Sequence, residues 1–317
     1  MTISGSAVPA SSLGLPLRWW FFRRRVRAAD QFRFAVSRLA SVTVDDRLHG
    51  VLVLEQIMID SARRHQLIIA ELATFLRHYP RAVPMAAPYG RHAFSQSSNG
   101  AVVRRAPADV QAAVTALGQR PKRAERTRLD LHGADLNGVN LFQARLRDIN
   151  LSRAQLRDAI LFRAQLQDAT MFQTRLENAN LSLANLQRAD LGGATLVHAF
   201  LPGAQLQAAR LPGAQLEHAN LRHALMQGTF LAGAYLGHAN LAGAQLQHAN
   251  LAGAHLQYAN LAGANLQHAN LTCAHMQGVN LAGAQLQHAN LGGAQLQNTS
   301  LAMARLRHAN LAGVRMA

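Results

Sequence analysis

Histidines recur at regular intervals toward the C-terminal end of the sequence, and imidazole is the side chain there best suited to chemistry. Four of them stand at every twentieth position, at His248, His268, His288 and His308. Imidazole nitrogens bind transition metals and transfer protons near neutral pH. Their constant spacing raises two interpretations, a row of metal ligands or a row of surface rings.

The sequence offers little else with which to catalyse a reaction. Its single thiol, Cys273, has His275 two positions away, but a catalytic nucleophile needs a base that orients and activates it, and chance proximity is the simpler explanation. The sequence has no glycine-rich phosphate motif and no cysteine cluster with metal-ligand spacing. We therefore predict no catalytic residues, no cofactor, no metal and no enzymatic activity. A single cysteine also excludes an internal disulfide, which is typical of a reducing cytoplasm.

Aromatic and basic residues adjoin one another near the N-terminus. Trp19 and Trp20 precede three consecutive arginines, Arg23, Arg24 and Arg25. Indole rings beside guanidinium groups suit an interfacial contact with anionic membrane, although a buried helix start with a solvated charge run is the simpler interpretation. No segment approaches the roughly 20 apolar residues of a membrane-spanning helix, and no signal peptide is recognisable. We expect a cytoplasmic protein, with peripheral membrane contact as the alternative.

Positive charge is concentrated in the same part of the chain. Residues 1–129 contain 20 Lys+Arg and 8 Asp+Glu, whereas residues 130–317 contain 12 and 8, within a formal net charge of +16. A basic surface suits nucleic acid, anionic lipid or an acidic protein, and charge alone does not choose among them.

The histidines lie within a pattern whose period is five residues. From Leu131 to Met316 every fifth residue is Leu or Met, at 38 positions without an insertion, and a small or β-branched residue usually stands two positions earlier. Five residues advance an α-helix by about 500°, so the leucines would not share a face. On a straight strand an odd period would send them to alternate faces. The chain must therefore bend within each five residues.

Proline and glycine mark where the bend occurs. Pro202-Gly203 and Pro212-Gly213 place these residues at the two central positions typical of a type II β-turn. A chain that turns the same way after every short segment winds into a solenoid, with Leu and Ala stacked inside.

The motif Ala-Asp/Asn-Leu-X-X, seen at residues 134–138, 179–183 and 189–193, resembles the pentapeptide-repeat proteins, and the resemblance covers residues 130–317. It implies a mainly β fold, a right-handed quadrilateral β-helix with four pentapeptides per coil. Every twentieth residue then stacks, so the four histidines above form one column, and His198, His218 and His238 form another. Steps of about 4.8 Å offer a zinc ion at most two neighbours in a column, whereas zinc takes four tetrahedral ligands. We interpret these columns as surface rings, and asparagines at the same interval as structural amide ladders.

The N-terminal part is predicted to be a smaller α-helical region. A Thr43-x-x-Asp46 capping box would begin one helix, Ser61 would cap the next, and Gly118 would end a short helix that covers the solenoid end. Residues 47–80 resemble a HEAT-like helix pair found upstream of the repeats in certain bacterial pentapeptide-repeat proteins. The expected divisions are a flexible or interfacial tail (1–22), a helical region (23–79), a linker (80–107), a capping helix with its lead-in (108–129) and the β-helix (130–317).

Three functions are compatible with these features. The first is a non-enzymatic scaffold whose repetitive surface binds an unidentified protein partner, with a homodimer through the C-terminal coil as a further hypothesis. The second is suggested by the resemblance to quinolone-resistance relatives, which imitate DNA and bind gyrase, but the basic charge of this chain disfavours it. The third is binding of nucleic acid or anionic membrane through the basic N-terminal region.

Overall fold

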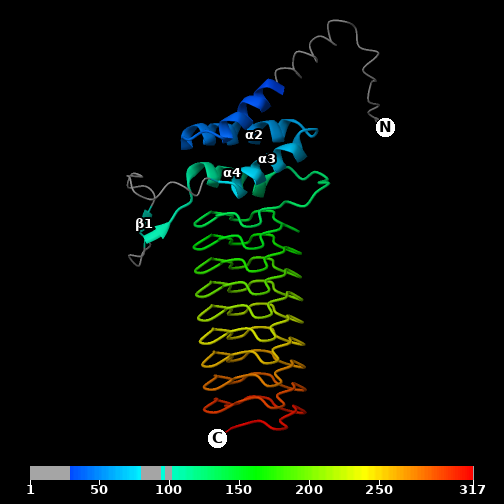
Figure 1. Cartoon of the computed structure of the whole chain (residues 1–317). Helices are drawn as coiled ribbons and strands as arrows, with labels where there is room; N and C mark the ends of the chain where they lie inside the picture. The colour runs from blue at the N-terminus through cyan, green and yellow to red at the C-terminus, as the bar shows by residue number, and fades with distance from the viewer. Residues whose placement is uncertain (1–28, 80–93, 97–101, 317) are drawn as a thin grey trace, which may run out of the picture.

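The computed structural model describes residues 29–79, 94–96 and 102–316, and within them a helical head stands on the end of a long rod (Figure 1). We call the described residues between 29 and 129 the head and residues 130–316 the rod. Trp19, Trp20 and the arginines at 23–25 lie outside the described residues. Within the described residues no helix is both long and apolar enough to span a membrane.

The rod is a β-helix in which four pentapeptides complete one coil. The residue before each inner leucine or methionine forms a parallel bridge with its counterpart four pentapeptides later. These bridges run from Asp130 with Asn150 to Gln295 with Arg315. The coils meet through isolated single-residue bridges and not through extended strands, because the backbone turns again within every pentapeptide.

Leucine and alanine fill the interior of the rod as the period of five predicts. From Leu131 to Leu296 the residues at these two positions are nearly all buried, most of them completely. Three threonines replace alanine, and each finds an acceptor: Thr174 Oγ1 donates to the Leu151 carbonyl at 2.9 Å, Thr229 Oγ1 to the Leu206 carbonyl at 2.9 Å, and the half-buried Thr299 Oγ1 to the Met276 carbonyl at 2.8 Å. The interior therefore holds these hydroxyls without an unpaired polar group, which would be costly.

The head consists of a helix over residues 29–39 followed by α2 (Val44–Asp60), α3 (His65–Arg77) and α4 (Ala108–Gln119). The Thr43 side chain caps α2 by accepting the Asp46 N–H at 3.3 Å. The reciprocal half of the predicted capping box is missing, because the Asp46 carboxylate binds Arg38 and Ser41 instead. The segment after α2 also differs from the expectation, since α3 begins at His65 and not directly after Ser61.

Helix α4 covers the first coil of the rod (Figure 1). Gly118 lies inside this helix and does not end it. A Cβ atom at Gly118 would come within 2.8 Å of Ala144 Cβ, so the glycine permits close contact between helix and coil. Its carbonyl accepts the Arg145 N–H at 2.8 Å, which pairs part of the coil edge that the helix covers.

The segment expected to be a linker contains a short hairpin. Strands β1 (Phe94–Gln96) and β2 (Val102–Arg104) pair in antiparallel register. The last residue of this segment, Pro107, leads directly into α4.

Candidate functional site

The turns of the rod share one geometry. The second turn residue of every pentapeptide from 133 to 313 has a positive φ, between 54° and 69°. At Pro202-Gly203 the φ of Gly203 is 64° and the Ala204 N–H donates to the Leu201 carbonyl at 3.0 Å; at Pro212-Gly213 the φ of Gly213 is 61°. This is type II geometry, and it points the side chains of the turns outward.

The turn histidines form the two columns expected for a coil of four pentapeptides. Ring centroids in the column His248, His268, His288 and His308 are 4.9 to 5.0 Å apart, with interplanar angles of 3° to 21°. In the second column His198, His218 and His238 stack at 4.9 Å, and Tyr258 continues the stack at 5.1 Å. Among the described residues no group of three or more His, Cys, Asp or Glu is arranged to hold a metal ion.

A third column of rings was missed by sequence reasoning. Tyr235 stacks on His255 at 4.8 Å, and His255 stacks on His275 at 4.6 Å. Burial, followed by the charge of His275, lowers the pKa of His255 below its usual value. These three rings are also spaced twenty residues apart, so their stacking could have been predicted from the sequence. It was overlooked because the three positions do not carry a single residue type.

Asparagines before the inner leucines support the turns. Asn240 Oδ1 accepts the Ala242 N–H at 3.1 Å, and the same Asx contact recurs in other coils, for example at Asn260 at 3.0 Å. Along the column, Asn310 Nδ2 donates to Asn290 Oδ1 at 2.9 Å. These side chains are occupied by the backbone and by each other, so their role is structural.

Apolar side chains gather on one edge of the rod near the head. Phe142 and Phe162 stack with ring centroids 5.8 Å apart, and Phe142, Ile160, Leu183 and Phe200 are each more than 40% exposed. The bridges Asn140 with Ile160, Ile160 with Asn180 and Asn180 with Phe200 place them on four successive coils at the same edge. We call these five residues the apolar edge: Phe142, Ile160, Phe162, Leu183 and Phe200.

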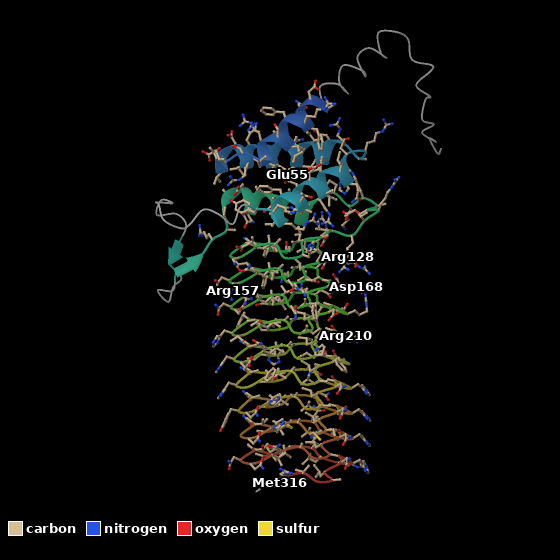
Figure 2. The ribbon with its side chains drawn as sticks, viewed as in Figure 1. Glu55, Arg128, Arg157, Asp168, Arg210 and Met316 are labelled. Atoms are coloured by element: carbon tan, nitrogen blue, oxygen red, sulfur yellow. The ribbon has the colours of Figure 1, made fainter. Side chains whose placement is uncertain are left out.

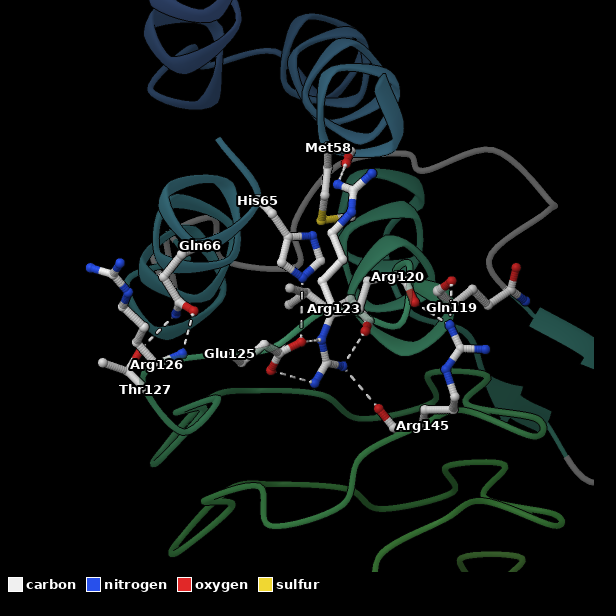
Figure 3. A network of polar contacts seen from close by, with 11 residues as sticks. Met58, His65, Gln66, Gln119, Arg120, Arg123, Glu125, Arg126, Thr127 and Arg145 are labelled. Carbon is white, nitrogen blue, oxygen red and sulfur yellow. Dashed lines mark hydrogen bonds and ion pairs between the residues drawn. The ribbon is translucent and has the colours of Figure 1, made fainter. Parts of the chain in front are cut away.

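A polar network joins the head to the rod (Figure 3). Arg120 pairs with Glu125 through Nε at 2.6 Å and Nη2 at 3.0 Å, and its Nη1 donates to the Arg145 carbonyl at 2.9 Å. Burial alone would raise the pKa of Glu125, but Arg120 brings this pKa below its usual value. His65, only 2% exposed, places Nε2 at 3.5 Å from Glu125 Oε1. Burial lowers the pKa of His65, which favours its neutral form.

The family model for pentapeptide repeats matches the chain in eight overlapping copies that together span residues 140–316. This is more than half of the 317 residues. The chain belongs to the pentapeptide-repeat family. The coil of four pentapeptides and the stacked columns of the rod are therefore features of a pentapeptide-repeat β-helix.

Solved structures of pentapeptide-repeat proteins are similar to part of the chain. HetL, from the cyanobacterium Nostoc sp. strain PCC 7120 and involved in the regulation of heterocyst differentiation, is 33% identical, covers 59% of this chain and 89% of its own, and gives a TM-score of 0.36. QnrB1, a plasmid-mediated fluoroquinolone resistance protein, is 18% identical, with 51% and 89% covered and a TM-score of 0.38. Rfr23 from the cyanobacterium Cyanothece 51142 is 22% identical, with 45% and 91% covered and a TM-score of 0.25. A search of curated proteins found no match.

Two groups of residues in this pentapeptide-repeat protein were not singled out from the sequence. The apolar edge is hidden in the sequence because most of its members stand about a full coil apart. The basic residues at the junction do leave a local signal, the run Arg120-Pro-Lys-Arg-Ala-Glu-Arg126, which sequence reasoning treated only as a lead-in to the first repeat.

Proposed function

We propose that this pentapeptide-repeat protein is a non-enzymatic binding protein whose rod presents the apolar edge to a protein partner. We also infer that the rod has the right-handed sense of winding that the family resemblance implies. End-to-end pairing of two copies through the C-terminal coil, and contact of the basic N-terminal segment with nucleic acid or anionic membrane, remain separate hypotheses.

The observation that carries this proposal is the exposure of the apolar edge. Contiguous exposed apolar side chains rimmed by polar groups are typical of protein interaction sites, and aromatic residues are enriched at such interfaces. Further along the rod the same edge carries Asn220, Asn240 and Asn260 in place of Ile160 and Phe200. The Phe, Ile and Leu residues of this edge therefore cluster on the coils near the head and are not required by the repeat; further along the same edge Met303 is exposed as a single apolar residue.

Leu183 strengthens the argument. It occupies a left-handed turn position with a φ of 56° and is 43% exposed. An L-residue costs about 1 to 2 kcal/mol in this conformation, and glycine at the same position in the next coil, Gly203, avoids that cost. Glycine or a polar residue occupies most of the equivalent turn positions of the rod, so an exposed leucine at this position favours a contact with a partner.

The charge of the rod supports a protein partner over mimicry of DNA. Carboxylates of the rod are bound by arginines of neighbouring coils, as in Arg188 Nε with Asp168 Oδ1 at 2.7 Å and Arg157 Nη2 with Glu177 Oε1 at 3.0 Å. Arg157 and Asp168 lie on opposite edges of the rod (Figure 2), so this neutralisation is not confined to one side. Between residues 191 and 317 the only acidic residue is Glu217. A protein that imitates DNA must present negative charges in place of the phosphate groups, and the surface of this rod has no excess of negative charge.

The test is site-specific photo-crosslinking in the native cell, with the photoreactive amino acid placed at Leu183 or Phe200. We expect a discrete crosslinked protein at both positions, and its loss when Phe142 and Ile160 are both changed to Asn. The partner should itself present apolar residues at its crosslinked peptide.

Phe172 provides the matched control. It is an aromatic residue with 42% exposure on the same stretch of coils, but it lies about half a coil away from Phe162 in sequence, on the opposite edge. Crosslinking from position 172 to the same protein with equal yield, or none from positions 183 and 200, would reject the apolar edge as the binding surface. Light scattering of the purified protein shows whether the crosslinked species is a second copy of the chain.

A further inference from the structure

A wide-open surface cavity of about 500 Å³ lies where the head meets the first coil of the rod. Its charged lining consists of five cations and one carboxylate, from Arg120, Lys122, Arg123, Arg145, Arg147 and Glu125. The remaining two lining residues, Pro121 and Ala124, are small and apolar. We call this cavity the junction pocket. Its charge distinguishes it from the nearly uncharged distal coils of the rod.

Two of the guanidinium groups are held in place by neutral backbone carbonyls alone. Arg123 donates to the Met58 carbonyl at 2.6 Å and the Ile59 carbonyl at 2.8 Å, in the last turn of α2. Arg145 donates to the carbonyls of Gln119 and Arg120 at the end of α4. A carbonyl satisfies the N–H groups without removing the formal charge. The pocket wall therefore keeps fixed positive charge that is already ordered before any ligand arrives.

The carboxylate in the lining does not balance these charges. Glu125 is committed to Arg120, which binds it through two nitrogens and is only 9% exposed. This pair cancels within itself, so Lys122, Arg123, Arg145 and Arg147 leave four positive charges in excess.

Two of the cations contribute nothing that the junction requires. Lys122 is exposed and has no ion pair with any residue in the described ranges. Arg147 is 70% exposed and lies 3.4 Å from Asp168 Oδ2, but Asp168 is already bound by Arg188 at 2.7 and 2.9 Å. Both side chains are thus available to close on a ligand without breaking the contacts that hold head and rod together.

We propose that the junction pocket binds a small polyphosphate anion. Its volume falls within the roughly 300 to 1,000 Å³ of small-molecule sites. Arginine guanidinium groups bind phosphate oxygens through paired, charge-assisted hydrogen bonds, and lysine adds a point charge. No aromatic ring is among the lining residues, so a nucleobase would find no stacking surface. The chemistry recognised is a chain of phosphates without a base.

The test is isothermal titration of the full chain with inorganic tripolyphosphate. We expect saturable binding with one site per chain, and weaker binding of pyrophosphate and orthophosphate in that order. Changing Lys122→Ala and Arg147→Ala together should lower the affinity at least about tenfold, equivalent to about 1.4 kcal/mol. The melting temperature of the double variant should stay near that of the wild type, because neither side chain packs in the junction.

A second double variant, Arg175→Ala with Arg222→Ala, removes the same charge from exposed positions on the rod outside the pocket and should keep the wild-type affinity. Equal weakening by both double variants, or no saturable binding of tripolyphosphate, would overturn the proposal. A short DNA duplex that binds more tightly than tripolyphosphate, with the same affinity for both variants, would assign the charge to a nucleic-acid surface instead. A variant of the apolar edge should bind tripolyphosphate normally, so this result and the protein-partner result can fail independently.

Discussion

At the scale of single residues, the turns show how strongly the core dictates backbone conformation. Of the residues with a positive φ in the turns, 23 are not glycine. Each costs about 1 to 2 kcal/mol in isolation, yet the geometry does not change between glycine, histidine and leucine. Stacking on the neighbouring coils and Asx contacts such as that of Asn240 with the Ala242 N–H outweigh the local preference. The pentapeptide therefore sets the turn, and the residue type at this position is free for other uses.

The ring column through His255 makes the stability of the rod depend on pH. The pKa of His255 is lowered first by burial and then by the charge of His275, while Glu217 acts in the opposite direction. The ring also stacks on Tyr235. Because the folded chain binds a proton at this position less readily than the unfolded chain, stability is complete above about pH 6.5, the unfolded value. It decreases as the pH falls from there through the lower folded value.

The variant His255→Gln should therefore lose less thermal stability than the wild type between pH 7 and pH 5. Glutamine occurs at the same column position in the rod, at Gln215 and Gln295, so the substitution is compatible with the coil. Melting curves followed by circular dichroism measure the difference. Equal losses in the two proteins would show that His255 does not contribute to the pH dependence.

At the scale of elements, the contact between α4 and the first coil determines how the rod begins. Helix propensity alone makes Gly118 unfavourable by about 1 kcal/mol, so a leucine there would stabilise the isolated helix. In the folded chain a Cβ atom at this position lies 2.8 Å from Ala144 Cβ. The tertiary contact, and not the propensity of the helix, explains the glycine.

Gly118→Leu is accordingly expected to destabilise the protein by about 1 to 3 kcal/mol or more, since overpacking forces the helix away from the coil. Urea unfolding followed by circular dichroism measures the free energy of unfolding. Gln119→Ala, at the exposed neighbouring position, should change it by less than about 0.5 kcal/mol. Greater stability of Gly118→Leu than of the wild type would mean that α4 does not pack on Ala144 as closely as described.

The interior of the rod could be predicted almost residue by residue, whereas the junction could not. The period of five identifies the buried positions between Leu131 and Leu296. Leucine recurs at every fifth residue and alanine two positions before it, and both can face the interior only if the chain bends once in each pentapeptide. The number of pentapeptides per coil came from the family resemblance, and the column through His255 was visible once every fourth pentapeptide was aligned. By contrast, Arg120 and Arg123 bind backbone carbonyls 25 and 65 residues away. A carbonyl is present at every residue, so such a contact leaves no signal in the sequence.

At the scale of the whole molecule, the rod is quasi-one-dimensional, because each coil contacts only its neighbours. Its two ends differ in chemistry: the coils next to the head carry the apolar edge and the cross-coil ion pairs, and the distal coils carry the ring columns and little formal charge. Binding through the apolar edge or the junction pocket therefore uses the coils nearest the head. The distal coils can change in number without altering either surface.

The independence of coils leads to a prediction about deletions. Removing residues 241–250 takes out two complete pentapeptides and rotates everything after them by half a coil, while Leu and Ala stay inside. The deletion also brings His268 to a position one complete coil after His238, so the columns His198, His218, His238 and His268, His288, His308 become one.

Removing residues 241–248 deletes fewer residues but places Ala249 and Asn250 where leucine and a turn residue belong. The chain must then bulge or leave leucines exposed. Each exposed leucine side chain lowers the free energy of unfolding by about 1.5 to 3 kcal/mol. We expect the ten-residue deletion to unfold in urea with a single steep transition and the eight-residue deletion to be less stable with a broadened one. If the two deletions unfold alike, the side chains inside the rod do not depend on the period of five, and the stacked columns that depend on it lose their basis.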